Sequence, residues 1–207
     1  MRVIGGQARG RRLVAPRGTE TRPATARVRA SVFSRLAARD AIAGARILDI
    51  FAGSGSFGIE ALSRGAGYVV FVDRAPAATS AIARNLSQFQ LTPRARIVTA
   101  DYRRALADLG KAGESFDVIF VDAPFVADST AEILALIAAL GLLAPEGRLV
   151  ARQFHRTPVP MGTALECVNL VKIGDHRVAF YRRLVSAEGS EQRFTSPPGK
   201  HVPSMPE

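Results

Sequence analysis

The chain has 207 residues, enough for one sizeable domain with a short extension, and its hydrophobic fraction of 47% is ordinary for a globular protein. It contains no apolar run of 18 residues and no apolar segment behind its basic N-terminus, so we expect neither a membrane association nor a signal peptide. The single cysteine excludes an internal disulfide and favours a reducing cytoplasm. The three histidines are too scattered to predict a metal site.

The net charge of +10 is unevenly distributed. Residues 1–29 contain eight arginines and one acid, a net charge of +7, whereas the rest of the chain has 20 basic and 17 acidic residues, a net charge of +3. A cluster of arginines at one end is what binding to a phosphate backbone requires. The alternative is a genome-wide bias towards arginine together with a solvated face. Such a bias explains arginine in place of lysine, but not the clustering.

The first 43 residues predict a basic hairpin followed by a helix. Val3–Ile4 and Leu13–Val14 are short apolar stretches around a glycine-rich turn, and such a hairpin needs something to pack against. The helix is predicted at about Thr25–Arg39, with an apolar stripe of Val28, Val32 and Leu36. We expect residues 1–43 to bind RNA through Arg9, Arg11, Arg12, Arg22, Arg27 and Arg29.

Apolar runs then alternate with helical stretches. Five runs predict strands at Arg46–Ile50, Tyr68–Val72, Arg96–Thr99, Asp117–Val121 and Arg148–Ala151. Strands this apolar, joined by helices, indicate a parallel sheet covered on both faces. Leu165–Ile173 and Arg177–Val185 predict a hairpin that closes the sheet with an antiparallel edge. We therefore expect an α/β domain with a mostly parallel seven-stranded sheet over residues 44–185, and a mobile tail over residues 186–207.

A glycine-rich turn follows the first of these strands. Gly53, Gly55 and Gly58 form a G-x-G-x-x-G pattern, and a helix is predicted at Phe57–Arg64. Such a turn offers free N–H groups to a negatively charged ligand group. Asp49 lies four residues before the first glycine, where a carboxylate is a poor neighbour for the pyrophosphate of a dinucleotide but favours a cationic group. S-adenosylmethionine (SAM) carries an ammonium, a sulfonium and a carboxylate, and is the cofactor that the pattern favours.

Each of the first four predicted strands ends near an acid. Because ligands bind outside the carboxyl ends of parallel strands, Asp49, Asp73, Asp101 and Asp122 are candidate site residues. Asp73 is predicted to accept hydrogen bonds from ribose hydroxyls, or else to cap the next helix. Asp101 is predicted to accept an adenine amino group, with Tyr102 beside the ring, and it is equally suited to be a helix N-cap.

The fourth strand leads into Asp122, Ala123, Pro124 and Phe125. An acceptor beside a rigid proline turn can hold an exocyclic amine by both hydrogens, and Phe125 can stack on a flat base. Positioning supplies most of the rate gain in methyl transfer to an amine, and Asp122 can accept a proton from that amine. A strand-end loop broken by proline is the alternative.

These stretches resemble the bacterial 16S rRNA guanine-N2 methyltransferases (the RsmD-type family) of the class I SAM-dependent methyltransferases. The resemblance covers residues 1 to about 181 and is carried by MRVIGGQARGRRL, RPATARVRASVFSRL, LDIFAGSGSFGIEALSRGA, VFVDR and DAPF. It implies a Rossmann-like fold, a cytoplasmic enzyme and transfer of a methyl group to guanine 966 of 16S rRNA, in the 30S subunit or its assembly intermediate. We expect a monomer.

Matched by motif, the resemblance implies a SAM site formed by Asp49, Phe51, Ala52, Gly53, Ser54, Gly55, Asp73, Arg74 and Asp101. The target amine would bind at residues 122–125. The chain departs from the family pattern at Ala123, where a second proline is usual. It also departs after the fifth predicted strand, which usually leads into an acid and here continues as Ala151-Arg152-Gln153-Phe154-His155.

Other functions remain open at this point. The same chemistry could act on an adenine N6 amine in DNA. A nicotinamide-dependent oxidoreductase would explain the glycine turn and Asp73, but not Asp49 or the arginine cluster. A non-catalytic RNA-binding assembly factor is favoured only by Ala123.

Overall fold

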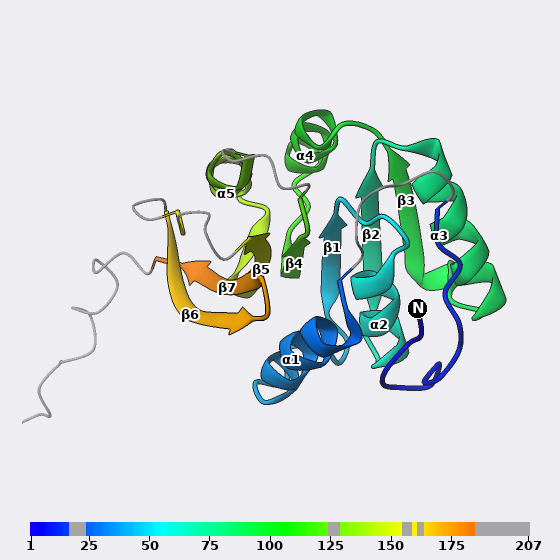
Figure 1. Cartoon of the computed structure of the whole chain (residues 1–207). Coiled ribbons are helices and arrows are strands. Elements are labelled where there is room, and N and C mark those ends of the chain that lie inside the picture. The colour runs from blue at the N-terminus through cyan, green and yellow to red at the C-terminus, as the bar shows by residue number, and fades with distance from the viewer. Residues whose placement is uncertain (17–23, 124–128, 155–158, 161–163, 185–207) are drawn as a thin grey trace, which may run out of the picture.

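The computed structural model describes residues 1–16, 24–123, 129–154, 159–160 and 164–184 (Figure 1). At its centre is a seven-stranded sheet in the order β3-β2-β1-β4-β5-β7-β6. Strands β1 to β5 run parallel to one another, whereas β7 is antiparallel to both β5 and β6, which confirms the predicted fold. The strands are β1 (Arg46–Ile50), β2 (Tyr68–Asp73), β3 (Ala95–Thr99), β4 (Phe116–Val121), β5 (Leu143–Phe154), β6 (Leu165–Ile173) and β7 (His176–Arg183).

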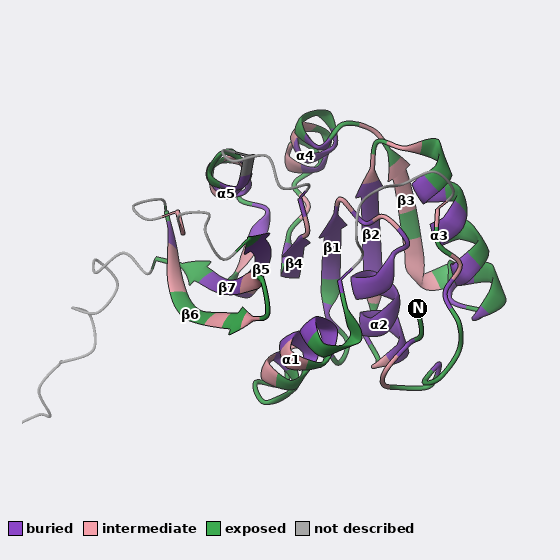
Figure 2. Cartoon of the chain, viewed as in Figure 1, coloured by how far each residue is buried: buried purple, intermediate pink, exposed green. Residues whose placement is uncertain are grey.

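Helices cover both faces of the sheet, as its near-continuous burial requires (Figure 2). Val118 and Phe120 of β4 pack with α1, α2 and α3, whereas Ile119 and Val121 pack with α4 and α5. None of the helices in the described part of the chain is long and apolar enough to cross a membrane. They are α1 (Ala26–Ala37), α2 (Ser56–Ser63), α3 (Pro76–Gln88), the 3-10 turn η1 (Thr92–Arg94), α4 (Tyr102–Lys111) and α5 (Ser129–Ala139).

Most predicted boundaries differ from the observed ones by one to three residues, but β5 is much longer than expected. The sequence predicts Arg148–Ala151, whereas the strand spans Leu143–Phe154. At its start, β5 pairs with β4 through a register shift between Phe116 and Val118, which accommodates a Pro-Glu-Gly stretch that reads as a turn. At its end, β5 continues along β7 beyond the last residue of β4.

The N-terminal hairpin packs against the core, as its small size requires. Arg2 and Arg12 form an antiparallel bridge, and Val3 and Leu13 are buried. Side chains of α2 and α3 hold the hairpin: Glu60 Oε2 accepts from Ile4 N–H at 2.8 Å, Ser63 Oγ from Ala8 N–H at 2.9 Å, and Asn85 Oδ1 from Val14 N–H at 2.8 Å.

Candidate active site at the carboxyl ends of the strands

The turn between β1 and α2 combines positive φ angles with close packing. Gly53 and Gly55 have φ angles of 57° and 74°, a region that favours glycine. A Cβ on Gly58 would lie 2.3 Å from the ring of Phe71, so only glycine lets α2 approach the sheet this closely. A Cβ on Gly53 would meet nothing nearer than Phe51 O at 4.0 Å. The turn thus borders open space at Gly53 and is tightly packed at Gly58.

Asp49 of β1 is a buried carboxylate with an unused acceptor. It is 1% exposed, and its Oδ2 accepts a hydrogen bond from Gly58 N–H at 2.9 Å. Its Oδ1 has no hydrogen-bond partner among the described residues. Burial raises the pKa of this carboxyl group well above its ordinary value, and the charges of Asp122 and Asp73 add to the rise, against the opposing Gly58 hydrogen bond. A cationic ligand group would offset this cost.

Asp73, at the end of β2, braces the glycine turn. Its Oδ2 accepts from Gly53 N–H at 2.8 Å, and its Oδ1 accepts from Ala75 N–H at 2.9 Å beside the start of α3. The alternative, that Asp73 caps the next helix, is wrong, because the N-cap residue of α3 is Ala75 and no side chain caps this helix. The bond to Gly53 was not predicted, because it joins residues of two different strand ends.

Asp101 is the N-cap of α4, one of the two roles predicted for it. Its Oδ1 accepts from Arg103 N–H at 2.9 Å, and the carboxylate is exposed. The next residue, Tyr102, is buried and packs its ring against Phe51 at a centroid distance of 5.2 Å. These two rings join the end of β1 to the start of α4. Arg74, another predicted residue, is exposed.

Asn85 of α3 joins the glycine turn to the N-terminal hairpin, a connection that the sequence did not predict. It is fully buried, and its Nδ2 donates to Ser54 O at 3.1 Å and to Val14 O at 3.0 Å. The available signal was a polar residue on the apolar stripe of α3, three positions after Ile82. Ser54 and Ala52, both predicted site residues, are themselves buried within the turn.

Asp122, directly after β4, forms an ion pair with Arg152 of β5. Arg152 Nε lies 2.5 Å from Asp122 Oδ1, and the two side chains are 7% and 14% exposed. Burial raises the pKa of Asp122, whereas the charge and hydrogen bond of Arg152 lower it. Ala123 is buried next to it. Pro124 and Phe125 lie outside the described residues, so their predicted roles stay predictions.

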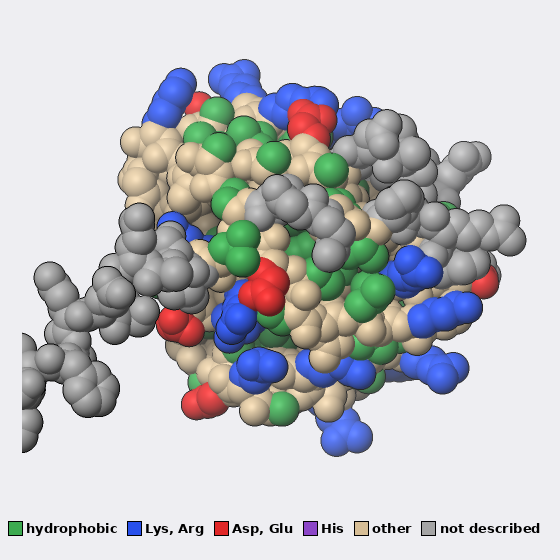
Figure 3. Space-filling model, turned by 90° about the vertical axis from the view of Figure 1, so that its left-hand side faces the viewer, with side chains coloured by type: hydrophobic (Ala, Val, Ile, Leu, Met, Phe, Trp, Pro, Cys, Tyr) green, Lys and Arg blue, Asp and Glu red, His purple; other side chains and the backbone are tan. Residues whose placement is uncertain are grey.

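The predicted RNA-binding arginines have different environments. Arg9, Arg12 and Arg27 are exposed, as contact with a polyanion requires. Arg11 is exposed as well, and its guanidinium stacks 4.5 Å from the centroid of the Phe89 ring. Figure 3, which faces the side of β6 and β7, shows further Lys and Arg side chains along its upper margin and across its lower half, among exposed hydrophobic atoms.

The prediction that Arg29 binds RNA is wrong. Its side chain is fully buried, donates to Ala24 O and to Arg2 O at 2.7 Å each, and ties the first residues to the start of α1. Burial lowers the pKa of this guanidinium from its ordinary value. The predicted stripe on α1 was too narrow, because Arg29 and Phe33 lie one position after its first two members and widen the buried face. Arg22 lies outside the described residues.

Comparisons with known proteins give the family. A family profile described as "Conserved hypothetical protein 95" matches residues 1–182. Ribosomal RNA small subunit methyltransferase D of Escherichia coli (strain K12) is 38% identical over 189 residues, covering 91% of this chain and 92% of that protein. The "Putative rRNA methyltransferase YlbH" of Bacillus subtilis (strain 168) is 39% identical over 160 residues, covering 77% of this chain and 86% of that protein. The solved structure of a hypothetical protein of Thermus thermophilus, TTHA0928, matches with a TM-score of 0.77 at 30% identity, covering 88% of this chain and 99% of that one.

These findings confirm the predicted Rossmann-like methyltransferase fold and SAM as the cofactor. Within the described residues, no group of three or more His, Cys, Asp or Glu side chains could hold a metal ion. The profile spans nearly the whole chain, and both relatives match over most of their own lengths. The chain therefore belongs to the family described as conserved hypothetical protein 95, the family of the RsmD-type methyltransferases.

Proposed function

We propose that the protein transfers a methyl group from SAM to the exocyclic N2 amine of a guanine in 16S rRNA, with guanine 966 of the assembling 30S subunit as the expected target. The observation that carries this proposal is the position of two acids, the buried Asp49 and the partly buried Asp122, at the ends of the neighbouring strands β1 and β4, beside the glycine turn. The names of the relatives support an rRNA substrate.

The residues around the turn fit SAM. Asp49 Oδ1 is a buried acceptor without a partner among the described residues, and Gly53 borders open space. We assign Asp49 to the ammonium group, Asp73 to the ribose hydroxyls, and the Phe51–Tyr102 pair to the adenine. SAM, when bound, supplies an electrophilic methyl group attached to a sulfonium. The protein's contribution is to fix the position of this group and to exclude water.

Asp122 and the Ala123 carbonyl are assigned to the target amine. As the amine nitrogen gains a methyl carbon, it becomes cationic and must lose one proton. A carboxylate within hydrogen-bond reach stabilises that cation and can accept the proton. Because Ala123 retains its backbone carbonyl, the second acceptor does not depend on the proline that is usual in the family.

The N-terminal extension is assigned to RNA. Arg9, Arg12 and Arg27 are exposed on residues 1–43, the segment of highest positive charge, while the catalytic domain is assigned to residues 44–185. Because phosphate contacts release counterions, binding of 16S rRNA should weaken steeply with rising salt. The segment 186–207 lies outside the described residues.

The test is transfer of radiolabelled methyl from SAM to 30S particles that lack the modification, followed by nucleoside analysis. We expect N2-methylguanosine with the wild type and a loss of about 10²- to 10⁴-fold with Asp122→Asn. Asp117→Asn is the matched control, since Asp117 lies at the opposite end of β4 and its contact with Arg46 N–H can be made by an amide oxygen.

Other outcomes of this assay identify the alternatives. Label in N6-methyladenosine of duplex DNA, with none in the 30S particle, would replace the guanine assignment. Tight SAM binding without turnover on 30S particles, free 16S rRNA or DNA would contradict the enzymatic proposal and favour a binding role in ribosome assembly.

A further inference from the structure

The ion pair between Asp122 and Arg152 follows from the register of two strands. Val121 of β4 is paired with Ala151 of β5. The residues that follow this pair, Asp122 and Arg152, therefore lie side by side at the carboxyl end of the sheet. The contact joins residues 30 positions apart in the sequence, and Arg152 Nε meets Asp122 Oδ1 at 2.5 Å. Arg152 is therefore held beside the residue that we assign to the target amine.

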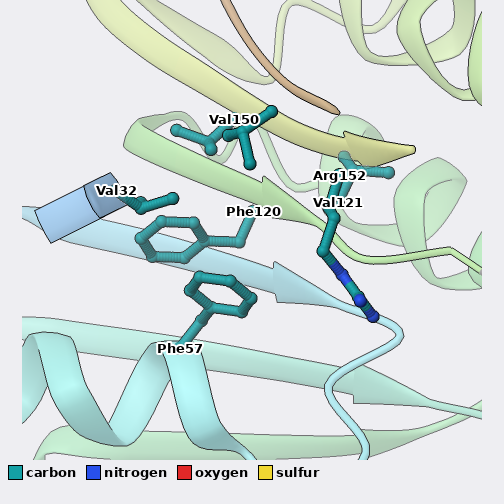
Figure 4. A pocket seen from close by; sticks show the side chains of 7 residues that line it. Val32, Phe57, Phe120, Val121, Val150 and Arg152 are labelled. Atoms are coloured by element: carbon teal, nitrogen blue, oxygen red, sulfur yellow. The ribbon is translucent and has the colours of Figure 1, made fainter. Parts of the chain in front are cut away.

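The surroundings of Arg152 are apolar. It lies at one end of a pocket lined by Val32, Phe57, Phe120 and Val150, among others, and only 7% of its side chain is exposed (Figure 4). Charges in such a site are weakly screened, so one guanidinium acts strongly on a neighbouring carboxylate. The aliphatic part of the Arg152 side chain also packs as a hydrophobic side chain does.

Arg152 favours the ionised form of Asp122. Burial favours its neutral form and raises its pKa. The groups that favour the ionised form are Arg152 of β5 and, through its charge when protonated, His176 of β7. A neutral Asp122 would offer a hydroxyl to the amine in place of a second acceptor oxygen.

We propose that Arg152 is a positioning residue for the methyl transfer, which fixes Asp122 through Oδ1, leaves Oδ2 for the substrate amine and keeps the carboxylate ionised. This inference rests on the proposed function. Arg152 does not touch the reacting atoms itself.

The test is the pH profile of kcat/KM for methyl transfer to 30S particles by wild type, Arg152→Met and Arg152→Lys. Methionine fills the apolar pocket without charge, whereas lysine restores the charge. We expect Arg152→Met to reduce kcat/KM about tenfold or more at pH 7 and to move the acid limb of the profile to higher pH. Arg152→Lys should restore much of the lost rate and move the limb back. Arg182→Gln breaks the exposed pair with Glu166 on β6 and should change neither.

A second measurement does not depend on activity. If Arg152 favours the ionised form of Asp122, loss of Arg152 raises the pKa of Asp122 further in the folded state. The thermal unfolding midpoint of Arg152→Met should therefore drop below that of wild type, by an amount that grows as pH rises above 3.8, the ordinary pKa of this carboxyl group. In an Asp122→Asn background this pH-dependent difference should disappear. Thermal unfolding measured at acidic pH also shows whether Arg152→Met is folded.

The outcomes separate the two proposals. A wild type that methylates nothing overturns the proposed function, and the positioning role with it. An active wild type whose Arg152→Met variant keeps the same pH profile, or gains activity, overturns the role of Arg152 alone. A rate loss that Arg152→Lys does not relieve, with an unmoved acid limb, shows a purely structural residue.

Discussion

Replacing Asp49 with asparagine should stabilise the protein while weakening SAM binding. The substitution preserves shape and the acceptor for Gly58 N–H but removes a negative charge that is 1% exposed. Because Oδ1 has no partner among the described residues, the charge lacks compensation for its lost hydration, and the neutral amide avoids about 1.4 kcal/mol for each pKa unit by which the folded state raises the pKa of Asp49. For a chain of this size, each kcal/mol shifts the melting temperature by about 2–4 °C.

The pH dependence has a definite sign. The pKa of Asp49 is raised in the folded state by burial, so the unfolded chain ionises first as pH rises. Wild type should therefore lose stability as pH increases from 3.8, the ordinary carboxyl value, through the higher folded value. The advantage of Asp49→Asn should be small in acid and grow towards pH 8.

Urea unfolding at pH 5 and pH 8 measures the stability, and calorimetry measures SAM binding. Loss of a charge-assisted hydrogen bond should raise the Kd for SAM about 10- to 100-fold. The exposed Asp108→Asn is the control and should change neither quantity. Unchanged SAM binding, or no gain in stability at pH 8, would refute the assignment of Asp49 as a buried, uncompensated acceptor for a cation.

Three further predictions concern other regions. Gly53→Ala and Gly44→Ala place alanine at similar positive φ angles, 57° and 71°, with no Cβ contact shorter than 4.0 Å; each should cost about 1 kcal/mol of stability in urea unfolding, but only Gly53→Ala should weaken SAM binding in calorimetry. Arg29→Met should lower the free energy of unfolding by about 1–3 kcal/mol, whereas Arg27→Met should leave it unchanged and reduce RNA binding in a filter assay at low salt. Asn85→Ala should speed amide hydrogen exchange across the N-terminal hairpin without unfolding the sheet.

Much of the sheet was predictable because its signal is local. Arg46–Ile50 and Leu165–Ile173 were predicted with the bounds that the structure has, since apolar runs and adjacent breakers decide where such strands begin and end. The start of β5 was not predictable in this way. Pro145 and Gly147 are typical of a turn, and only pairing with β4 shows that the strand continues through them.

The difference between local sequence signals and long-range pairing also explains which features of the site could be predicted. Acids that follow parallel strands meet at one edge of the sheet, so Asp49, Asp73 and Asp122 could be chosen from the sequence. Their partners could not, because the contact of Asp122 with Arg152 depends on strand register, and that of Asp73 with Gly53 on the path of a turn. A sequence pattern can thus identify the acids of such a site, whereas the packed structure determines which of them remain charged.

The three acids differ in how their oxygens are engaged, and this difference gives each a separate role. Both oxygens of Asp73 accept backbone N–H groups, so this carboxylate is already stabilised and shapes the turn. Asp122 shares one oxygen with Arg152, so it is held in place with its charge only partly compensated. Asp49 has a single backbone hydrogen bond, and burial raises the pKa of its carboxyl group well above its ordinary value. A cation should therefore gain most by binding at Asp49, which is why we assign the ammonium of SAM there and the target amine to Asp122.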